Sequence, residues 1–218
     1  EKPFYSLPTQ VAGISYRKKI NLLLRYLKNK KADFIFISAP ENVAWLLNIR
    51  GSDTPYSPLP NCNLILGKNK KFYLITEKYK TKKLLIERKL LFDQVIERNN
   101  FENLINSLKG KKFIIDDKTL SVFNENIIKK KFLINSRIDP CYFFKSIKNS
   151  IEIKNMIQSH ITDGVALTKF LFWIKNFKNK NLTELSAEKK LESFRKKSKK
   201  YLYPSFSTIA GAGSNGAI

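Results

Sequence analysis

The chain has 218 residues, of which 43% are hydrophobic and 12% aromatic, so its composition is that of a globular protein with a buried core. No apolar run approaches the roughly 20 residues that a membrane-crossing helix needs, and no signal-peptide pattern opens the chain. The formal charge of +23 raises the question of nucleic-acid binding. The lysines are spread along the whole chain, however, and no zinc finger, recognition helix or aromatic RNA-binding signature accompanies them, so we do not expect nucleic acid as a partner.

Alternating helices and strands are predicted for the first two-thirds of the chain. The first 13 residues, which contain Pro3, Pro8 and Gly13, are expected to form an extended lead-in. Ser15 is predicted to cap the first helix, and Gly110 to stop the fourth. The predicted helices cover residues 16–29, 41–47, 82–88, 101–108 and 120–130, and the predicted strands cover residues 34–37, 62–66, 72–75, 93–96, 113–116 and 132–135. This alternation predicts an α/β sandwich with a mixed sheet.

The pattern changes near residue 140. Asp139-Pro140 favours a turn, and a long helix follows that begins at Asn149 or Ser150 and runs to about residue 177. A break over residues 179–181 and a cap at Thr183 predict a second helix, in which Leu185, Leu191 and Phe194 can face a core. The tail is expected to be a strand that passes into a glycine-rich turn. We therefore place a domain boundary that separates residues 1–140 from residues 141–218.

The long helix carries the only histidine of the chain, His160. It belongs to an apolar stripe with Met156, Gly164, Leu167, Leu171 and Ile174. No carboxylate or cysteine stands at ligand spacing from it, so a packed, hydrogen-bonded core histidine is the better interpretation than a metal ligand. A catalytic triad built from this chain alone would have to use His160, and nothing beside it supports that role.

Other candidate sites also lack partners. Asp116-Asp117 follows a predicted strand, where neighbouring side chains point to opposite faces, so a turn or a helix cap is expected. The turn at residues 211–216 lacks the lysine and hydroxyl residue of a phosphate loop and the glycine spacing of a dinucleotide site, so its glycines are expected to serve positive φ or close approach. Cys62 and Cys141 have no metal-ligand spacing and are expected to be reduced, partly buried thiols of a cytoplasmic protein. The residues themselves thus predict no catalytic and no metal-binding group.

Three stretches together resemble the X-Pro aminopeptidase branch of the creatinase, prolidase and methionine aminopeptidase family. The first is Ala44-Trp-Leu-Leu-Asn-Ile-Arg-Gly-Ser-Asp53, followed by Pro55 and Pro58. The second runs from Lys148-Asn149 to His160-Ile-Thr-Asp-Gly-Val-Ala-Leu167. The third combines Leu182-Thr-Glu-Leu-Ser-Ala187 with Ser205-Phe-x-Thr-Ile-x-Gly-x-Gly-x-Asn-Gly-Ala-Ile218. In this order and spacing the three stretches are specific, and they span nearly the whole chain.

The resemblance implies a domain organisation. Residues 1–140 look like the creatinase-type α/β domain that precedes the catalytic domain, which is the second of three domains in the longer members. Residues 141–218 look like the first helices and first strand of a truncated α+β pita-bread domain. Because the chain begins without an initiator methionine and ends at Ile218, we expect it to be a fragment.

The resemblance also implies a reaction that the chain itself cannot complete. Enzymes of this family hydrolyse the bond between an N-terminal residue and a following proline. They use two divalent metal ions, often manganese, held by two Asp, one His and two Glu. All five ligands lie downstream of Ile218 in the family, so the chain is expected to bind no metal and to be inactive, while the parent enzyme acts on peptides with proline in the second position.

A few residues are candidates for the wall or rim of the substrate pocket. By the resemblance, Phe206, Thr208 and Ile209 look like pocket wall, with strand and turn scaffolding as the alternative. Arg50 and Asp53 could lie on the rim of the cleft, or they could pair with each other to hold their loop. Two rival functions stay open, namely a non-catalytic relative that binds a partner or nucleic acid, and a prolidase or creatinase sibling. A homodimer is a further expectation.

Overall fold

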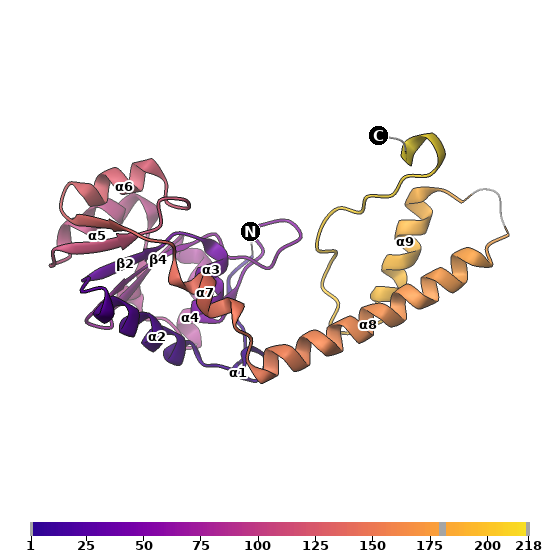
Figure 1. The fold of residues 1–218 in the computed structure, drawn as a ribbon, viewed down its shortest axis with the longest axis horizontal. Coiled ribbons are helices and arrows are strands. Elements are labelled where there is room, and N and C mark those ends of the chain that lie inside the picture. The colour runs from indigo at the N-terminus through magenta and orange to yellow at the C-terminus, as the bar shows by residue number, and fades with distance from the viewer. Residues whose placement is uncertain (1, 179–181, 217–218) are drawn as a thin grey trace. The chain divides into compact units, whose positions relative to one another are not determined.

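The structure is a computed structural model that describes residues 2–178 and 182–216 (Figure 1). It divides into two compact units, residues 1–151 and residues 152–218. The division falls within one long helix, α8 (Ser150–Lys175). No helix of the described residues is both long enough and apolar enough to cross a membrane.

The first unit is a mixed α/β fold, as predicted. Its helices are α1 (Thr9–Ala12), α2 (Tyr16–Asn29), α3 (Pro40–Leu47), α4 (Lys82–Ile86), α5 (Phe101–Ser107), α6 (Val122–Lys129) and α7 (Pro140–Ser146). Its strands are β1 (Tyr5–Ser6), β2 (Phe34–Ile37), β3 (Ile49–Arg50), β4 (Asn63–Gly67), β5 (Phe72–Ile75), β6 (Val95–Ile96), β7 (Lys112–Ile115) and β8 (Leu133–Ser136). Within the described residues the main sheet has six strands in the order β6-β5-β4-β2-β7-β8.

The direction of the pairs makes the sheet mixed. The β2–β4 and β4–β5 pairs are antiparallel, while the β2–β7, β7–β8 and β5–β6 pairs are parallel. The central strand β2 is buried on both faces, as its unbroken apolar run predicts. Helices α2, α3, α4 and α7 contribute buried side chains to the core on one face of the sheet, and α5 and α6 contribute them on the other (Figure 1).

Helix α2 shows how the local sequence fixes an element. The hydroxyl of Ser15 accepts a hydrogen bond from the backbone N–H of Lys18, which caps the helix at its predicted start. Leu23 and Leu27 are completely buried, because they lie one turn apart on the face toward the sheet. Lys19 is 2% exposed on the same helix, so its burial is an exception to the predicted division into an apolar and a charged face.

Three local predictions for the first unit are wrong. The expected extended lead-in contains α1 and strand β1, which pairs with β3, and Phe4 beside it is completely buried. Helix α5 ends before Gly110, where a Cβ atom would lie 2.8 Å from the Cβ of Asp33, so this glycine allows close packing rather than stopping a helix. The expected turn at Asp139-Pro140 starts α7, with the Asp139 carboxylate capping the helix and the proline in its first turn.

The second unit consists of most of α8, of α9 (Glu184–Arg195) and of the tail. The predicted cap at Thr183 is present, since its hydroxyl accepts a hydrogen bond from the N–H of Ser186. The predicted break over residues 179–181 lies outside the described residues. Asp163 of α8 and Arg195 of α9 form an ion pair whose shorter contact is 2.7 Å.

Most core roles predicted for the second unit are wrong within the described residues, although Leu191 and Phe194 are half-buried. Of the side chains on α8, Ala166 alone is buried there, while His160 is exposed, as are Met156 and Leu171 from its stripe. On α9, Leu185 is 67% exposed. Residues 206–212 form no strand, because no described segment pairs with them, and a short 3₁₀ helix (Gly213–Gly216) follows.

Candidate functional site

The stretch that joins α3 to β4 contains the shaped loop of the first unit. Helix α3 ends at Asn48, which adopts the left-handed conformation with φ 51°. After β3 the chain enters residues 51–60, here named the proline loop, which folds back on itself through the hydrogen bonds from Gly51 N to Pro58 O (3.2 Å) and from Asp53 N to Leu59 O (3.3 Å). A Cβ atom on Gly51 would lie 2.6 Å from the Cα of Pro60, so the two ends of the proline loop can approach this closely only with glycine at position 51.

A network of charged side chains anchors the proline loop to the sheet. The Asp53 carboxylate accepts a hydrogen bond from the N–H of Asn61 (2.7 Å) and lies 3.1 Å from the Nζ of Lys80. Lys80 also lies 3.4 Å from Glu77, which pairs with Arg98 at 3.0 Å. Arg98 in turn donates to the backbone carbonyl of Asn61 (2.8 Å). Asp53 and Arg98 both bind Asn61, the residue that follows the proline loop. The network therefore fixes the position and direction of the chain where the loop ends.

Arg50 also fixes this region, but through backbone groups. Its Nη1 donates to the carbonyl of Ile49 (2.8 Å) and to that of Ala44 (3.3 Å). Burial lowers the pKa of the guanidinium from its ordinary value. Arg50 and Asp53 thus have different partners, and the alternative in which they pair with each other is not the observed arrangement.

Three cationic side chains meet at the end of α3, and sequence reasoning missed two of them. The Nζ of Lys19 donates to the carbonyl of Trp45 (2.9 Å) and to the Oδ1 of Asn48 (2.7 Å). The Nζ of Lys89 donates to the backbone carbonyl of Asn48 (2.6 Å). Together with Arg50, these residues bind carbonyl groups at the C-terminal end of the helix, where positive charge is favourable. In a chain so rich in lysine, neither position carries a sequence signal.

The predicted residues of the tail have a different environment. Phe206 is 64% exposed, Ile209 is 91% exposed and Thr208 is exposed as well. The turn that follows is tied to α9, since Glu184 accepts hydrogen bonds from the N–H of Ala212 (3.1 Å) and the side-chain amide of Asn215 (3.0 Å). Within this turn Gly213 has φ 57°, and a Cβ on Gly211 would lie 2.6 Å from a backbone oxygen, as predicted for a glycine turn.

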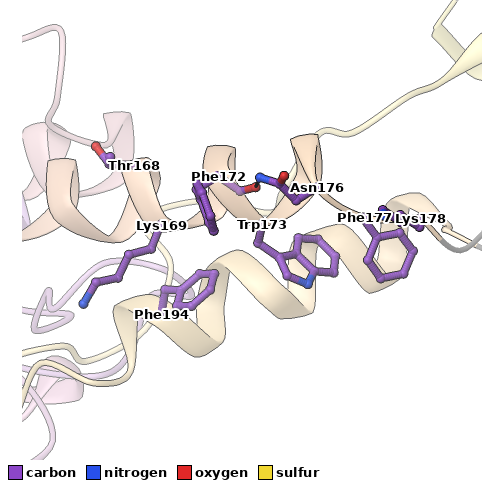
Figure 2. Close-up of a pocket in the computed structure, with 8 residues that line it drawn as sticks. All are labelled: Thr168, Lys169, Phe172, Trp173, Asn176, Phe177, Lys178 and Phe194. Carbon is purple, nitrogen blue, oxygen red and sulfur yellow. Dashed lines mark hydrogen bonds between the residues drawn. The ribbon is translucent and has the colours of Figure 1, made fainter.

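A groove of about 710 Å³ lies on the second unit between α8 and the aromatic ring of Phe194 (Figure 2). The rings of Trp173 and Phe177 lie 4.8 Å apart between centroids and are tilted by 54°, and Lys190 lies 5.4 Å from the centre of the Trp173 ring. The described residues that line the groove are mostly aromatic, with no carboxylate, histidine or cysteine among them: Thr168, Lys169, Phe172, Trp173, Asn176, Phe177, Lys178 and Phe194.

The described residues do not fit a pair of metal ions. Among residues 2–178 and 182–216, no three His, Cys, Asp or Glu side chains are grouped so that they could hold one. Asp116 accepts hydrogen bonds from the N–H groups of Lys118 and Asp139, and the first of these forms the turn that was one of its two predicted roles. Cys62 and Cys141 are free and completely buried, not partly buried as expected, and burial raises the pKa of both thiols.

Comparison with known proteins decides the family. A family model described as the creatinase/prolidase N-terminal domain matches residues 1–152. The chain belongs to the creatinase/prolidase N-terminal domain family. It is 31% identical over 229 residues to the Xaa-Pro aminopeptidase ApepP of Drosophila melanogaster and 33% identical over 223 residues to Xaa-Pro aminopeptidase 1 of Dictyostelium discoideum, and each match covers 98% of this chain. The chain spans 36% and 35% of the lengths of these two relatives.

Solved structures agree with this membership. The X-prolyl aminopeptidase of Caenorhabditis elegans, a cytosolic enzyme with a di-nuclear active site, matches 95% of this creatinase-family chain with a TM-score of 0.83 and 27% identity. The match covers 35% of the nematode enzyme. The Xaa-Pro dipeptidase of Bacillus anthracis matches 84% of the chain with a TM-score of 0.61 at 16% identity, which supports the fold alone.

Proposed function

We propose that this chain is part of a metal-dependent X-Pro aminopeptidase, a hydrolase that releases the N-terminal residue from peptides with proline in the second position. The observation that carries the proposal is the similarity to aminopeptidases of this kind along 95 to 98% of the chain, at 27 to 33% identity. The alternative function as a prolidase is less well supported, because the matched Xaa-Pro dipeptidase structure of Bacillus anthracis shares 16% identity with the chain.

Residues 1–140 are proposed to be the domain that precedes the catalytic one, and residues 141–218 the start of a pita-bread catalytic domain. In this arrangement Arg50 and Asp53 lie on the rim of the substrate cleft, and Phe206, Thr208 and Ile209 contribute to its wall. The anchored proline loop supports the rim role, since a rim that selects peptides must keep its shape. The exposure of the three tail residues is compatible with contact to a substrate or to another part of the parent enzyme.

The metal chemistry is proposed for the parent enzyme and not for this chain. The nematode enzyme has a di-nuclear site. Two metal ions, with manganese as the expected element, would supply an activated water for hydrolysis when bound. The described residues offer no such ligand set, so we derive no step of the reaction from them. A cytoplasmic location is proposed from the cytosolic relative and the two free thiols. A homodimer stays a prediction, which light scattering of the parent enzyme tests.

The proposal is tested by two experiments. Purified chain with Mn²⁺ is expected to release no N-terminal residue from an X-Pro peptide, and clear turnover would show that the chain contains chemistry we do not assign to it. The reading frame beyond Ile218 is expected to encode the series of two Asp, one His and two Glu. If that series is absent, the parent is a non-catalytic relative and the proposed function fails.

A further inference from the structure

Lysines gather at one edge of the main sheet of the first unit. Strands β2, β7 and β8 begin at this edge, and the antiparallel pair β4–β5 turns there. The segments that meet at it are residues 28–33, 67–71, 109–112 and 129–133, here named the lysine edge. They contain twelve lysines, all of them exposed, and a single carboxylate, Asp33. Lysine is thus spread along the sequence but is not spread evenly in space.

Hydrogen bonds make the four segments one continuous surface. The Asp33 carboxylate accepts hydrogen bonds from the N–H groups of Lys111 (2.7 Å) and Lys112 (2.9 Å) and forms an ion pair with Lys68 at 2.6 Å. The N–H of Leu133 donates to the carbonyl of Lys111 (2.8 Å). The one carboxylate of the lysine edge is therefore already occupied by groups of the protein.

The opposite edge of the sheet lacks this excess of positive charge. There the segments next to the strand ends, residues 38–42, 61–62, 76–80, 116–119 and 137–139, contain four basic residues and five carboxylates. A general excess of lysine in the composition would load both edges alike. The contrast indicates that the placement of the lysines, and not their number alone, distinguishes the lysine edge.

Part of the lysine edge serves the fold. Helices α2 and α6 both end there, and Lys28 and Lys129 lie in their last turns, where positive charge is favourable for a helix. This role does not extend to the turn between β4 and β5, which follows a strand and carries three lysines of its own. Within the described residues, three of the twelve lysines form ion pairs, so nine positive charges have no carboxylate within ion-pair distance.

The lysine edge is also hollowed. A cavity of about 280 Å³ lies beside Gly110, and four lysines line it, namely Lys111, Lys129, Lys130 and Lys131. Lysine binds phosphate as a point charge on a flexible stem, so several lysines can approach one phosphate group from different sides. The surface therefore combines a row of cations with a recess that a phosphate group can enter.

We propose that the lysine edge binds a strand of nucleic acid through its phosphates. Adjacent strands of a sheet lie about 4.8 Å apart, so the lysine groups on the neighbouring strands β4, β2, β7 and β8 form a row about 15 Å long. At roughly 3.4 Å per phosphate, such a row faces about five phosphates of one strand. Contacts to phosphate carry no sequence information, so the binding has little sequence preference.

The side chains between the lysines favour this ligand over two others. Among these four described segments, the one aromatic ring, that of Phe132, is buried, so bases have no exposed ring on which to stack. Leu133 is the one large apolar side chain exposed there, whereas attachment to a membrane surface requires an apolar face. Phosphate contact along a strand is the interaction that remains.

The test is fluorescence anisotropy of a labelled oligouridylate of about 12 nucleotides, titrated with the 218-residue chain at several salt concentrations. We expect a Kd of about 10 μM near 0.1 M salt. Five phosphate contacts predict that the logarithm of the association constant falls with the logarithm of the salt concentration with a slope of about −3. An oligoadenylate and a DNA strand of the same length should bind within about threefold of the oligouridylate.

A triple variant locates the binding surface. Lys30→Gln, Lys71→Gln and Lys111→Gln take one exposed charge from each of three segments, and none of the three lysines forms an ion pair within the described residues. We expect the affinity to fall about tenfold or more and the salt slope to change from about −3 to about −1, because three phosphate contacts are lost. Circular dichroism verifies that the variant is folded.

The matched control removes the same charge elsewhere. Lys82→Gln, Lys83→Gln and Lys118→Gln change three exposed lysines outside the lysine edge and should lower the affinity less than about threefold, with an unchanged slope.

The proposal is overturned if the chain does not bind the oligonucleotide below about 0.1 mM, or if the two triple variants lose affinity equally, which would mean that net charge alone attracts the strand. It is also overturned if vesicles with about a quarter of phosphatidylserine bind the chain and the oligonucleotide does not. None of these outcomes depends on the peptidase proposal.

Discussion

Lys80 and Asp53 form an ion pair of 3.1 Å in which the two side chains are only 4% and 7% exposed. The pair joins the proline loop to the segment after β5, and Glu77 and Arg98 extend it to Asn61. Burial makes such a pair costly to break, because a charge that loses its partner in the interior is not rehydrated. The shape of the loop thus depends on charges that lie away from its tip.

Asp53→Asn should destabilise the first unit. The change keeps the side-chain size but removes the charge that faces Lys80 at 3.1 Å, and we expect a loss of about 2 kcal/mol in the free energy of unfolding, measured by urea titration. Glu102→Gln is the control, since its ion pair with Lys130 is shorter (2.8 Å) but exposed and should be worth less than about 0.5 kcal/mol. Equal losses for the two variants would show that burial of the Asp53 pair does not matter.

Gly51→Ala should destabilise the first unit, although it adds only one methyl group. The new methyl group would lie 2.6 Å from the Cα of Pro60 and 2.8 Å from the carbonyl of Leu59, so the backbone of the loop must move. We expect a loss of about 2 kcal/mol. Gly164→Ala is the matched change, because nothing lies within 4 Å of that position on α8, and it should strengthen the helix by up to about 1 kcal/mol. Hydrogen exchange of the two segments measures both effects, and protection of residues 51–60 that is unchanged in Gly51→Ala would contradict the observed packing.

Asp33 should give the fold an acid-sensitive component. Burial opposes its ionisation, but hydrogen bonds from Lys68 and from the N–H groups of Lys112 and Lys111 outweigh it and lower the pKa to about 2. A carboxylate whose pKa is lower in the folded than in the unfolded state stabilises the fold above pH ~4, and this stabilisation is lost as the pH falls toward 2.

Asp33→Asn should therefore cost about 1 kcal/mol at neutral pH, a value reduced for solvent screening, and almost nothing near pH 2. Urea titrations of both proteins at several pH values measure the difference. A cost that stays constant down to pH 2 would mean that the charge of Asp33 contributes nothing.

Elements with local signals could be predicted from the sequence. Ser15 and the apolar spacing after it define α2, and the unbroken run at Phe34–Ile37 defines a strand buried on both faces. The lead-in was mispredicted because its structure comes from distant contacts: Phe4 donates its N–H to the carbonyl of Lys80, and β1 pairs with β3. No local pattern of the first 13 residues contains those partners.

The residues of the candidate site also fall into those with a local sequence signal and those fixed by distant contacts. Arg50 and Asp53 could be predicted as site candidates because their loop is rich in glycine and proline. No sequence pattern identifies the residues that they contact. Lys19, Lys80 and Lys89 look like any other lysine of this chain. Their contacts depend on the three-dimensional approach of α2 and of the segment after β5 to the end of α3 and to the proline loop. Conversely, the stripe on α8 suggested a buried face, and the described residues leave most of it exposed.

The most direct test is the activity of the enzyme encoded by the uninterrupted reading frame that contains this chain. With Mn²⁺ present, we expect release of the N-terminal residue from a peptide with proline in the second position, no release from the same peptide with alanine there, and loss of activity after chelation of the metal. Arg50→Ala in that enzyme should raise KM more than it lowers kcat if Arg50 lies on the rim. Equal cleavage of the proline and alanine peptides, or cleavage of neither, would contradict the proposed function.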